Sequence, residues 1–246
     1  MKRFNWQIYL AVFLILLSVI LYLLHFYIFR DSHHIFIYLL GDIAFVPIEV
    51  LLVTIIIHQL LNLRERRAML EKLNMVIGAF FSEVGTYLLK FISDFDPHVE
   101  EIKQKLIIKK DWTDKDFRSV RRELRDFAYK VDSKEMDLAS LKNFLSSKRG
   151  FLLRLLENPN LLEHEYFTDL LWAVFHATEE LIHRKDVGNL PDTDYEHLSG
   201  DVKRMYRALV LEWVDYMLHL RNNYPYLFSL SLRTNPFDEK ATPEVS

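Results

Sequence analysis

The chain contains no cysteine among its 246 residues. Disulfide bonds, thiolate nucleophiles and cysteine-ligated zinc or iron–sulfur sites are therefore excluded. Glycine and proline are also scarce, with six and seven residues respectively. So few turn-forming residues in a chain of this length favour long helices over a turn-rich β fold. The scarcity of both residue types predicts an all-α protein.

The chain also lacks a marked excess of charge, because its formal net charge at pH 7 is −3. It has no general attraction to nucleic acid, so no nucleic-acid partner is expected. Common catalytic signatures are missing: there is no phosphate-cradling glycine loop, G-x-S-x-G elbow, protein-kinase motif set or H-E-x-x-H. The sequence gives no positive sign of an enzyme.

Two long apolar runs are present near the start of the chain. Residues 7–29 carry no acidic or basic side chain except His25, and residues 35–61 form the second run. About 20 apolar residues, at 1.5 Å each, cross a bilayer core about 30 Å thick. The first run is too long for a signal peptide and has no small-residue cleavage site after it. Both runs therefore predict transmembrane helices.

The linker between the runs, RDSHH, has room only for a tight hairpin. Cationic residues flank the pair at both outer ends: Lys2, Arg3, Arg64, Arg66 and Arg67. Since such cations favour the cytoplasmic side, both termini are predicted to be cytoplasmic. The expected organisation is a transmembrane hairpin over 1–61 in the inner or plasma membrane, followed by a cytoplasmic helical bundle.

The second run carries three residues that lipid-facing helices avoid, namely Asp42, Pro47 and Glu49. Asp42 and Glu49 are seven residues apart and share one helix face. Ser18 and His25 have the same spacing in the first run. Antiparallel packing places His25 near the depth of Asp42. It places Ser18 near the depth of Glu49. Pro47 frees a backbone carbonyl and predicts a hinge.

Three roles remain open for this polar face. A buried charge at such depth costs about 3 kcal/mol unless it is paired, neutralised or hydrated, so the four side chains could simply satisfy one another. In an oligomer the carboxylates could instead line a shared axis as a cation pathway. They could also form a protonation or lipid-headgroup site. Because two helices offer little shelter for two carboxylates, a homo-oligomer is expected.

The rest of the chain has a helical pattern throughout. A long helix is predicted to continue from the second run over 62–96. A cytoplasmic all-α domain over 97–236 is then predicted to hold five helices: 97–109, 114–130, 137–156, 162–185 and 195–221. Capping residues support two of these starts: Thr113 with Asp116, and Asp137. The polar end, 237–246, is predicted to be disordered.

Carboxylates and histidines gather on one face of the predicted helix 162–185. They are Asp169, His176, Glu180 and His183, at spacings of seven, four and three. Glu180-x-x-His183 has the arrangement of carboxylate-bridged di-metal bundles. The last predicted helix offers possible opposing ligands: Glu212, Asp215 and His219. Because only one Glu-x-x-His pair occurs, both a divalent metal site and a polar face with ion pairs remain open, and no other cofactor is expected.

The predicted helix 114–130 carries a group of arginines: Arg118, Arg121, Arg122 and Arg125. Close to a membrane, these side chains would contact anionic lipid headgroups. Acidic residues interleaved with them favour ordinary ion pairs on a solvated face. Lipid contact and a solvated face both remain open for this helix.

The sequence is therefore compatible with three alternative classes of function. The first is an oligomeric membrane protein with a cytoplasmic interaction or sensing domain, in which Asp42 and Glu49 permit ion permeation. The second is a membrane-anchored, metal-dependent enzyme that uses the helix 162–185. The third is a scaffold that brings a cytoplasmic protein partner to the membrane. The missing catalytic motifs weigh against the enzyme.

Overall fold

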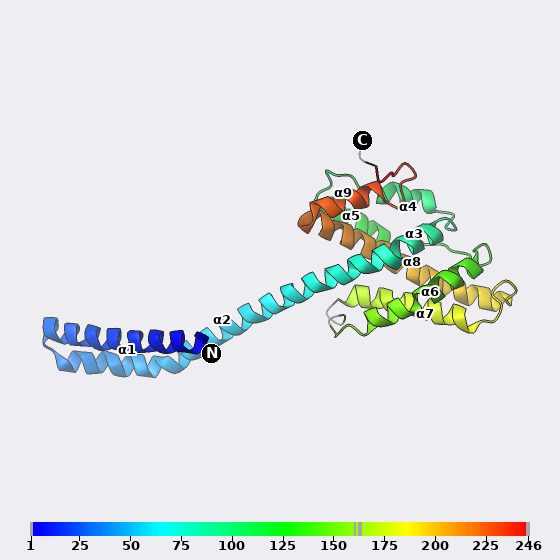
Figure 1. Ribbon diagram of the computed structural model, residues 1–246. Helices are drawn as coiled ribbons and strands as arrows, with labels where there is room; N and C mark the ends of the chain where they lie inside the picture. The colour runs from blue at the N-terminus through cyan, green and yellow to red at the C-terminus, as the bar shows by residue number, and fades with distance from the viewer. Residues whose placement is uncertain (1, 160, 162–163, 245–246) are drawn as a thin grey trace. The chain divides into compact units, whose positions relative to one another are not determined.

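A computed structural model describes residues 2–159, 161 and 164–244. In this part of the chain all regular structure is helical and no strand occurs (Figure 1). This confirms the all-α class predicted from the scarcity of glycine and proline. The chain divides into two compact units, Met1–Glu65 and Arg66–Ser246.

The first unit consists of two antiparallel helices, α1 (Lys2–Phe29) and the first part of α2 (Ser32–Phe80) (Figure 1). Arg30 reverses the chain between them with a φ of 49°, in the left-handed region that non-glycine residues seldom adopt. The Asp31 carboxylate then accepts a hydrogen bond from the His34 amide at 3.2 Å, which caps the start of α2. The turn is thus as tight as the short linker requires.

Among the described residues, three helical stretches are long and apolar enough to span a membrane: Ile8–Phe29, Ser32–Glu65 and Glu71–Ser93. In the first two, no residue of the most apolar window is buried, whereas 44% of that window is buried in the third. The third stretch owes its apolar character to side chains that pack in the core of the second unit, such as Leu73 and Ile77. The first two stretches leave their apolar side chains exposed.

The second unit is built around α8 (Asp192–Asn223), which packs against α3, α5, α7 and α9. Its other elements, after the end of α2, are as follows: the π-helical turn η1 (Phe81–Gly85), α3 (Thr86–Ser93), α4 (Val99–Leu106), α5 (Asp114–Arg125), α6 (Leu138–Leu156), α7 (Glu165–His183) and α9 (Pro225–Arg233). α6 packs against α7, and α4 packs against α5.

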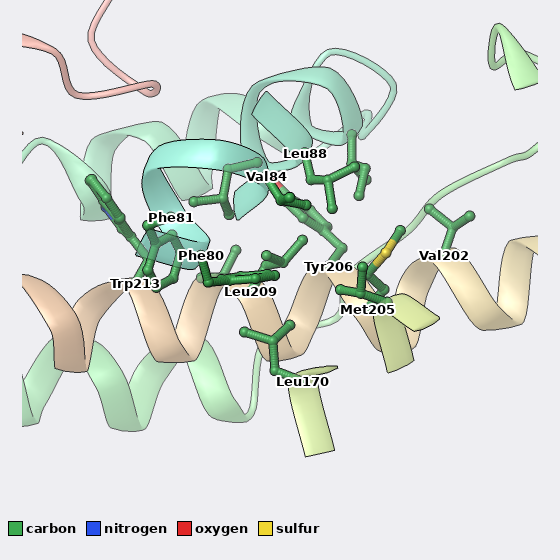
Figure 2. Packing of buried hydrophobic residues seen from close by; sticks show 14 of the residues in the cluster. Phe80, Phe81, Val84, Leu88, Leu170, Val202, Met205, Tyr206, Leu209 and Trp213 are labelled. Carbon is green, nitrogen blue, oxygen red and sulfur yellow. The ribbon is translucent and has the colours of Figure 1, made fainter. Parts of the chain in front are cut away.

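Aromatic and aliphatic side chains fill the space between η1, α3 and α8. Figure 2 shows Phe80, Phe81, Val84 and Leu88 facing Met205, Tyr206, Leu209 and Trp213 of α8. The Phe81 and Trp213 rings meet edge to face at 5.4 Å between centroids, a favourable aromatic geometry. A Cβ atom on Gly85 would lie 2.5 Å from the Phe81 ring, so this close packing requires glycine.

Several predicted helix ends differ from the observed ones. The predicted helix 62–96 ends at Ser93, and it passes through the π-helical turn η1 after Phe80. The predicted helix 114–130 ends at Arg125, because the Tyr129 hydroxyl folds back and donates to the Leu124 carbonyl at 2.9 Å. Both predicted caps are confirmed: the Thr113–Asp116 capping box is formed, and Asp137 accepts from the Ser140 amide.

The C-terminal part is more ordered than the sequence suggested. α9 was not predicted, although proline at its first position is a common helix start. Phe237, the first residue of the predicted tail, is buried at 1% exposure. Its amide donates to Asn235 Oδ1, and Asn235 Nδ2 donates to the Leu106 carbonyl at 2.7 Å. Residues 245–246 of the predicted tail lie outside the described residues.

Candidate metal centre

α7 and α8 each carry a histidine and a carboxylate one helical turn apart. On α7 these are His176 and Glu180, and on α8 they are His197 and Asp201. Residues at i and i+4 project from the same face of a helix. Since α7 packs against α8, the two pairs meet in one group of four side chains, here named the metal-like cluster.

Some distances within the cluster equal those between metal ligands, and the others are longer. Asp201 Oδ2 lies 3.3 Å from Nε2 of His176 and 3.3 Å from Nε2 of His197. One ligand atom from each of His176, Glu180 and His197 lies within 4.8 Å of the others. A tetrahedral ion with nitrogen and oxygen ligands at about 2.0–2.1 Å keeps these atoms about 3.3 Å apart. Small side-chain adjustments would therefore suffice to bind a divalent ion.

Two arginines orient the carboxylates. Arg184 Nη1 donates to Glu180 Oε2 at 2.6 Å, and this hydrogen bond lowers the pKa of Glu180. Arg204 Nη1 donates to Asp201 Oδ1 at 3.0 Å, which leaves Oδ2 facing the histidines. Asp201 Oδ2 is buried and accepts no hydrogen bond in the part of the chain that the structure describes, although both imidazoles lie 3.3 Å away. Outer partners of this kind are typical of metal ligands.

The predicted ligand set is only partly brought together. His176 and Glu180 belong to the cluster, whereas Asp169 is exposed elsewhere on α7. His183 is also exposed, and its Nδ1 atom lies 2.8 Å from the Glu179 carbonyl of its own helix. His183, which the Glu-x-x-His pattern predicted, therefore lies outside the cluster.

The residues missed at the sequence level are His197 and Asp201. Their signal was present, because HLSGD repeats on α8 the four-residue spacing of His176 and Glu180 on α7. What the sequence did not give was the register of the two helices, which the packing of α7 on α8 determines.

The predicted opposing ligands on α8 form a different network. Glu212 is 2% exposed, and its Oε1 atom lies 3.8 Å from His164 Nε2. Burial raises the pKa of Glu212 to about 8 and lowers that of His164. Asp215 accepts two hydrogen bonds from Arg121 Nε, at 2.6 and 2.7 Å. His219 is within hydrogen-bonding distance of Asn223, so none of the three α8 residues joins the metal-like cluster.

The predicted arginine group lies only partly at a cavity. Arg121 and Arg125 line a cavity of about 730 Å³ between α5, α7 and α8. Arg118 and Arg122 are not among its lining residues, and the Arg118 side chain is exposed. Contact of the four arginines with lipid headgroups remains a prediction.

The predicted membrane residues lie in the first unit. Ser18, His25 and Asp42 line a cavity of about 640 Å³ between α1 and α2, whereas Glu49 is exposed and is not among its lining residues. Pro47 lies within α2. The His25 Nδ1 atom is buried and has no hydrogen-bond partner among the described residues. Pairing of the polar residues and hinge motion at Pro47 remain predictions.

Comparison with known proteins assigns the chain to a family. A family model described as "Uncharacterized protein MJ1433, C-terminal helical domain" matches residues 69–233, and one described as "MJ1433, N-terminal helical domain" matches residues 2–61. The relative "Uncharacterized protein MJ1433" of Methanocaldococcus jannaschii is 48% identical over 237 residues, which cover 96% of this chain and 95% of the relative. No solved structure matches the chain significantly. The chain therefore belongs to the MJ1433 family.

Proposed function

We propose that this protein is anchored in a membrane and that its helical domain binds a divalent metal ion. The observation that carries the proposal is the position of Asp201 Oδ2, 3.3 Å from the Nε2 atoms of both His176 and His197. A buried carboxylate oxygen that accepts no hydrogen bond is costly unless a cation satisfies it, and a metal ion held between the two histidines would do so. Two histidines and two carboxylates supply the ligand types that zinc, iron and manganese accept.

The first two apolar stretches support the membrane part of the proposal. Their exposed side chains would be costly in water but stable in hydrocarbon. In this arrangement residues 1–61 form the hairpin, and the cationic flanks place both termini and the helical domain on the cytoplasmic side. The membrane is the inner or plasma membrane of the cell.

A metal ion at this cluster would have chemical consequences. If three of the four side chains bind the ion, one coordination position stays open for water or a substrate. Such an ion lowers the pKa of bound water and polarises a bound oxygen. The domain would then act as a metal-dependent enzyme at the membrane, whereas binding by all four side chains would make the ion structural.

Metal content of the full-length protein tests the proposal. The protein is purified in detergent, incubated with zinc, iron(II) or manganese, desalted, and analysed by inductively coupled plasma mass spectrometry. We expect a stoichiometric metal in the wild type and its loss in His176→Ala and His197→Ala. His183→Ala is the matched control, because this histidine lies on α7 outside the cluster. Metal-free wild-type protein, or equal loss in His183→Ala, would overturn the proposal.

A second candidate is a homo-oligomer in which the hairpin conducts ions. The specific observation is that Asp42 and Glu49 are both exposed in the single chain, so their cover would have to come from lipid, water or other hairpins. Native mass spectrometry in nanodiscs gives the subunit number. Ion flux into liposomes should then fall in Asp42→Asn and Glu49→Gln without a change in that number. A monomer, or unchanged flux, removes this candidate and leaves a membrane anchor or scaffold.

A further inference from the structure

The cavity between α5, α7 and α8 is rich in positive charge. Its lining includes five cationic residues: Arg121, Arg125, Lys203, Arg204 and Arg207. Two acidic residues, Asp169 and Glu212, also line it. A volume of about 730 Å³ lies within the usual range of small-molecule sites. Of these cations, only Arg121 and Arg125 form part of a cluster in the sequence, because the α8 cations join them through helix packing.

Part of this charge is already neutralised and part is not. Arg121 pairs with Asp215, and Arg204 pairs with Asp201. Lys203 and Arg207 form no ion pair with any residue that the structure describes, and Arg207 Nη2 donates instead to the Arg125 carbonyl at 2.9 Å. Both side chains are exposed. An anion that enters the cavity therefore meets cations that no carboxylate has neutralised.

Glu212 adds a polar group to this cavity without opposing an anion. Its side chain is almost fully buried, and its Oε2 atom has no hydrogen-bond partner among the described residues. Burial raises its pKa to about 8, so the carboxyl group is mostly protonated at pH 7. A neutral carboxylic acid can donate a hydrogen bond to an anionic oxygen.

Two exposed aromatic residues, Tyr166 and Trp172, line the same cavity. The Arg121 guanidinium lies over the Tyr166 ring, 4.9 Å from its centroid. The Trp172 side chain is 55% exposed, unusual for so large an apolar group. Stacking on a planar ring would remove this apolar surface from water.

We propose that this cavity binds a phosphorylated small molecule with a planar ring, of the nucleotide class. Lys203 and Arg207 bind the phosphates, and Trp172 stacks on the ring. Arginine and lysine are the usual phosphate partners in proteins, and base stacking on aromatic side chains tolerates any base. The binding depends on these cations and not on the metal cluster, although His176 lines the cavity and would place a metal ion at its edge.

Calorimetric titration of the full-length protein in phosphatidylcholine nanodiscs tests the proposal. The probes are ATP, inorganic triphosphate and adenosine, each in the presence of EDTA, so that the result is independent of metal binding. We expect ATP to bind most tightly, triphosphate more weakly and adenosine most weakly. Binding of ATP should also weaken as salt is raised, because its phosphate contacts are ionic.

Single substitutions locate the site. Lys203→Ala and Arg207→Ala should each weaken ATP about tenfold, since each removes a charge-assisted contact. Trp172→Ala should weaken ATP but leave triphosphate unchanged. Gly200→Leu should block all three probes, because Gly200 lines the cavity and a Cβ there meets no atom within 4 Å. Arg118→Ala is the control, since this exposed arginine of the same basic helix does not line the cavity.

Three results would overturn the proposal. The first is the absence of ATP binding by correctly folded wild-type protein, judged by its circular dichroism spectrum. The second is a loss of ATP binding in Arg118→Ala as large as in Arg207→Ala. The third is binding to phosphatidylglycerol vesicles that Lys203→Ala and Arg207→Ala abolish, with no binding of ATP. The phosphate would then belong to a lipid headgroup, and the planar ring would have no part in recognition.

Discussion

At the scale of single residues, Glu212 shows how burial changes the chemistry of a side chain. It lies on the central helix α8 and is 2% exposed. The groups around it come from three helices: Arg121 on α5, His164 at the start of α7 and Asp215 on α8. His164 Nδ1 accepts the Phe167 amide, so the neutral imidazole carries its proton on Nε2, toward Glu212. Desolvation is the largest influence on Glu212 and outweighs its neighbours, so the pKa of the carboxyl group is raised.

The raised pKa of Glu212 predicts how the stability of the protein depends on pH. The pKa of Glu212 is raised to about 8 in the folded state, from 4.5 in the unfolded chain. The folded protein thus binds more protons between these values, so the contribution of Glu212 to stability is present below pH 4.5 and is lost as pH rises toward 8. Glu212→Gln should remove this dependence. Thermal unfolding followed by circular dichroism at pH 5, 6.5 and 8 measures it against the wild type. A constant difference between the two proteins across this range would contradict the assignment.

Gly85 gives a second prediction at this scale. A Cβ atom there would lie 2.5 Å from Phe81 and 2.9 Å from Phe80, two fully buried rings. Gly85→Ala should therefore destabilise the second unit by about 1–3 kcal/mol, the usual cost of overpacking. Gly200→Ala is the matched helical control, because its Cβ meets nothing within 4 Å and alanine favours the helix by about 0.5–1 kcal/mol. Chemical unfolding of both variants measures the difference. Equal stability of the two variants would contradict the packing argument.

At the scale of elements, the sequence predicted what local contacts decide. The capping residues of α5 and α6 act within four residues along the chain, so their pattern can be read directly. The π-helical turn η1 and the register of α7 on α8 depend on distant side chains, so neither can be predicted from local sequence patterns. In the metal-like cluster, His176 and Glu180 were predicted from the pattern of a single helix. His197 and Asp201 were not, because they lie on a second helix.

The hydrogen bonds of Asn235 give a prediction about how the C-terminal segment is held. Asn235 is buried and joins the end of α4 to the segment after α9 through Leu106 and Phe237. Asn235→Ala should leave the buried Phe237 amide unpaired, at a cost of about 1–3 kcal/mol. It should also remove one of the two hydrogen bonds to the Leu106 carbonyl, which still accepts the Ile108 amide. Asn222→Ala, at an exposed position of α8, should change stability little. Limited proteolysis should also cut Asn235→Ala near its C-terminus faster than the control. Equal cutting would show that Asn235 does not hold this segment.

At the scale of the whole molecule, the absence of cysteine makes membrane topology directly testable. Any single introduced cysteine is the one thiol of the protein. Ser32 lies at the turn between α1 and α2, and Ser146 is exposed on α6 of the second unit. With both termini cytoplasmic, the cationic flanks predict that Ser32→Cys faces the outside and Ser146→Cys the cytoplasm.

A membrane-impermeant maleimide applied to intact cells should label Ser32→Cys and should label Ser146→Cys only after the membrane is opened. The cysteine-free wild type sets the background in the same experiment. The reverse pattern would place the helical domain outside, and the cationic flanks would then not determine orientation. Labelling of both cysteines in intact cells would mean that the two apolar helices do not cross the membrane as a hairpin. Their exposed apolar surface would then require a protein partner, because water alone leaves it unburied.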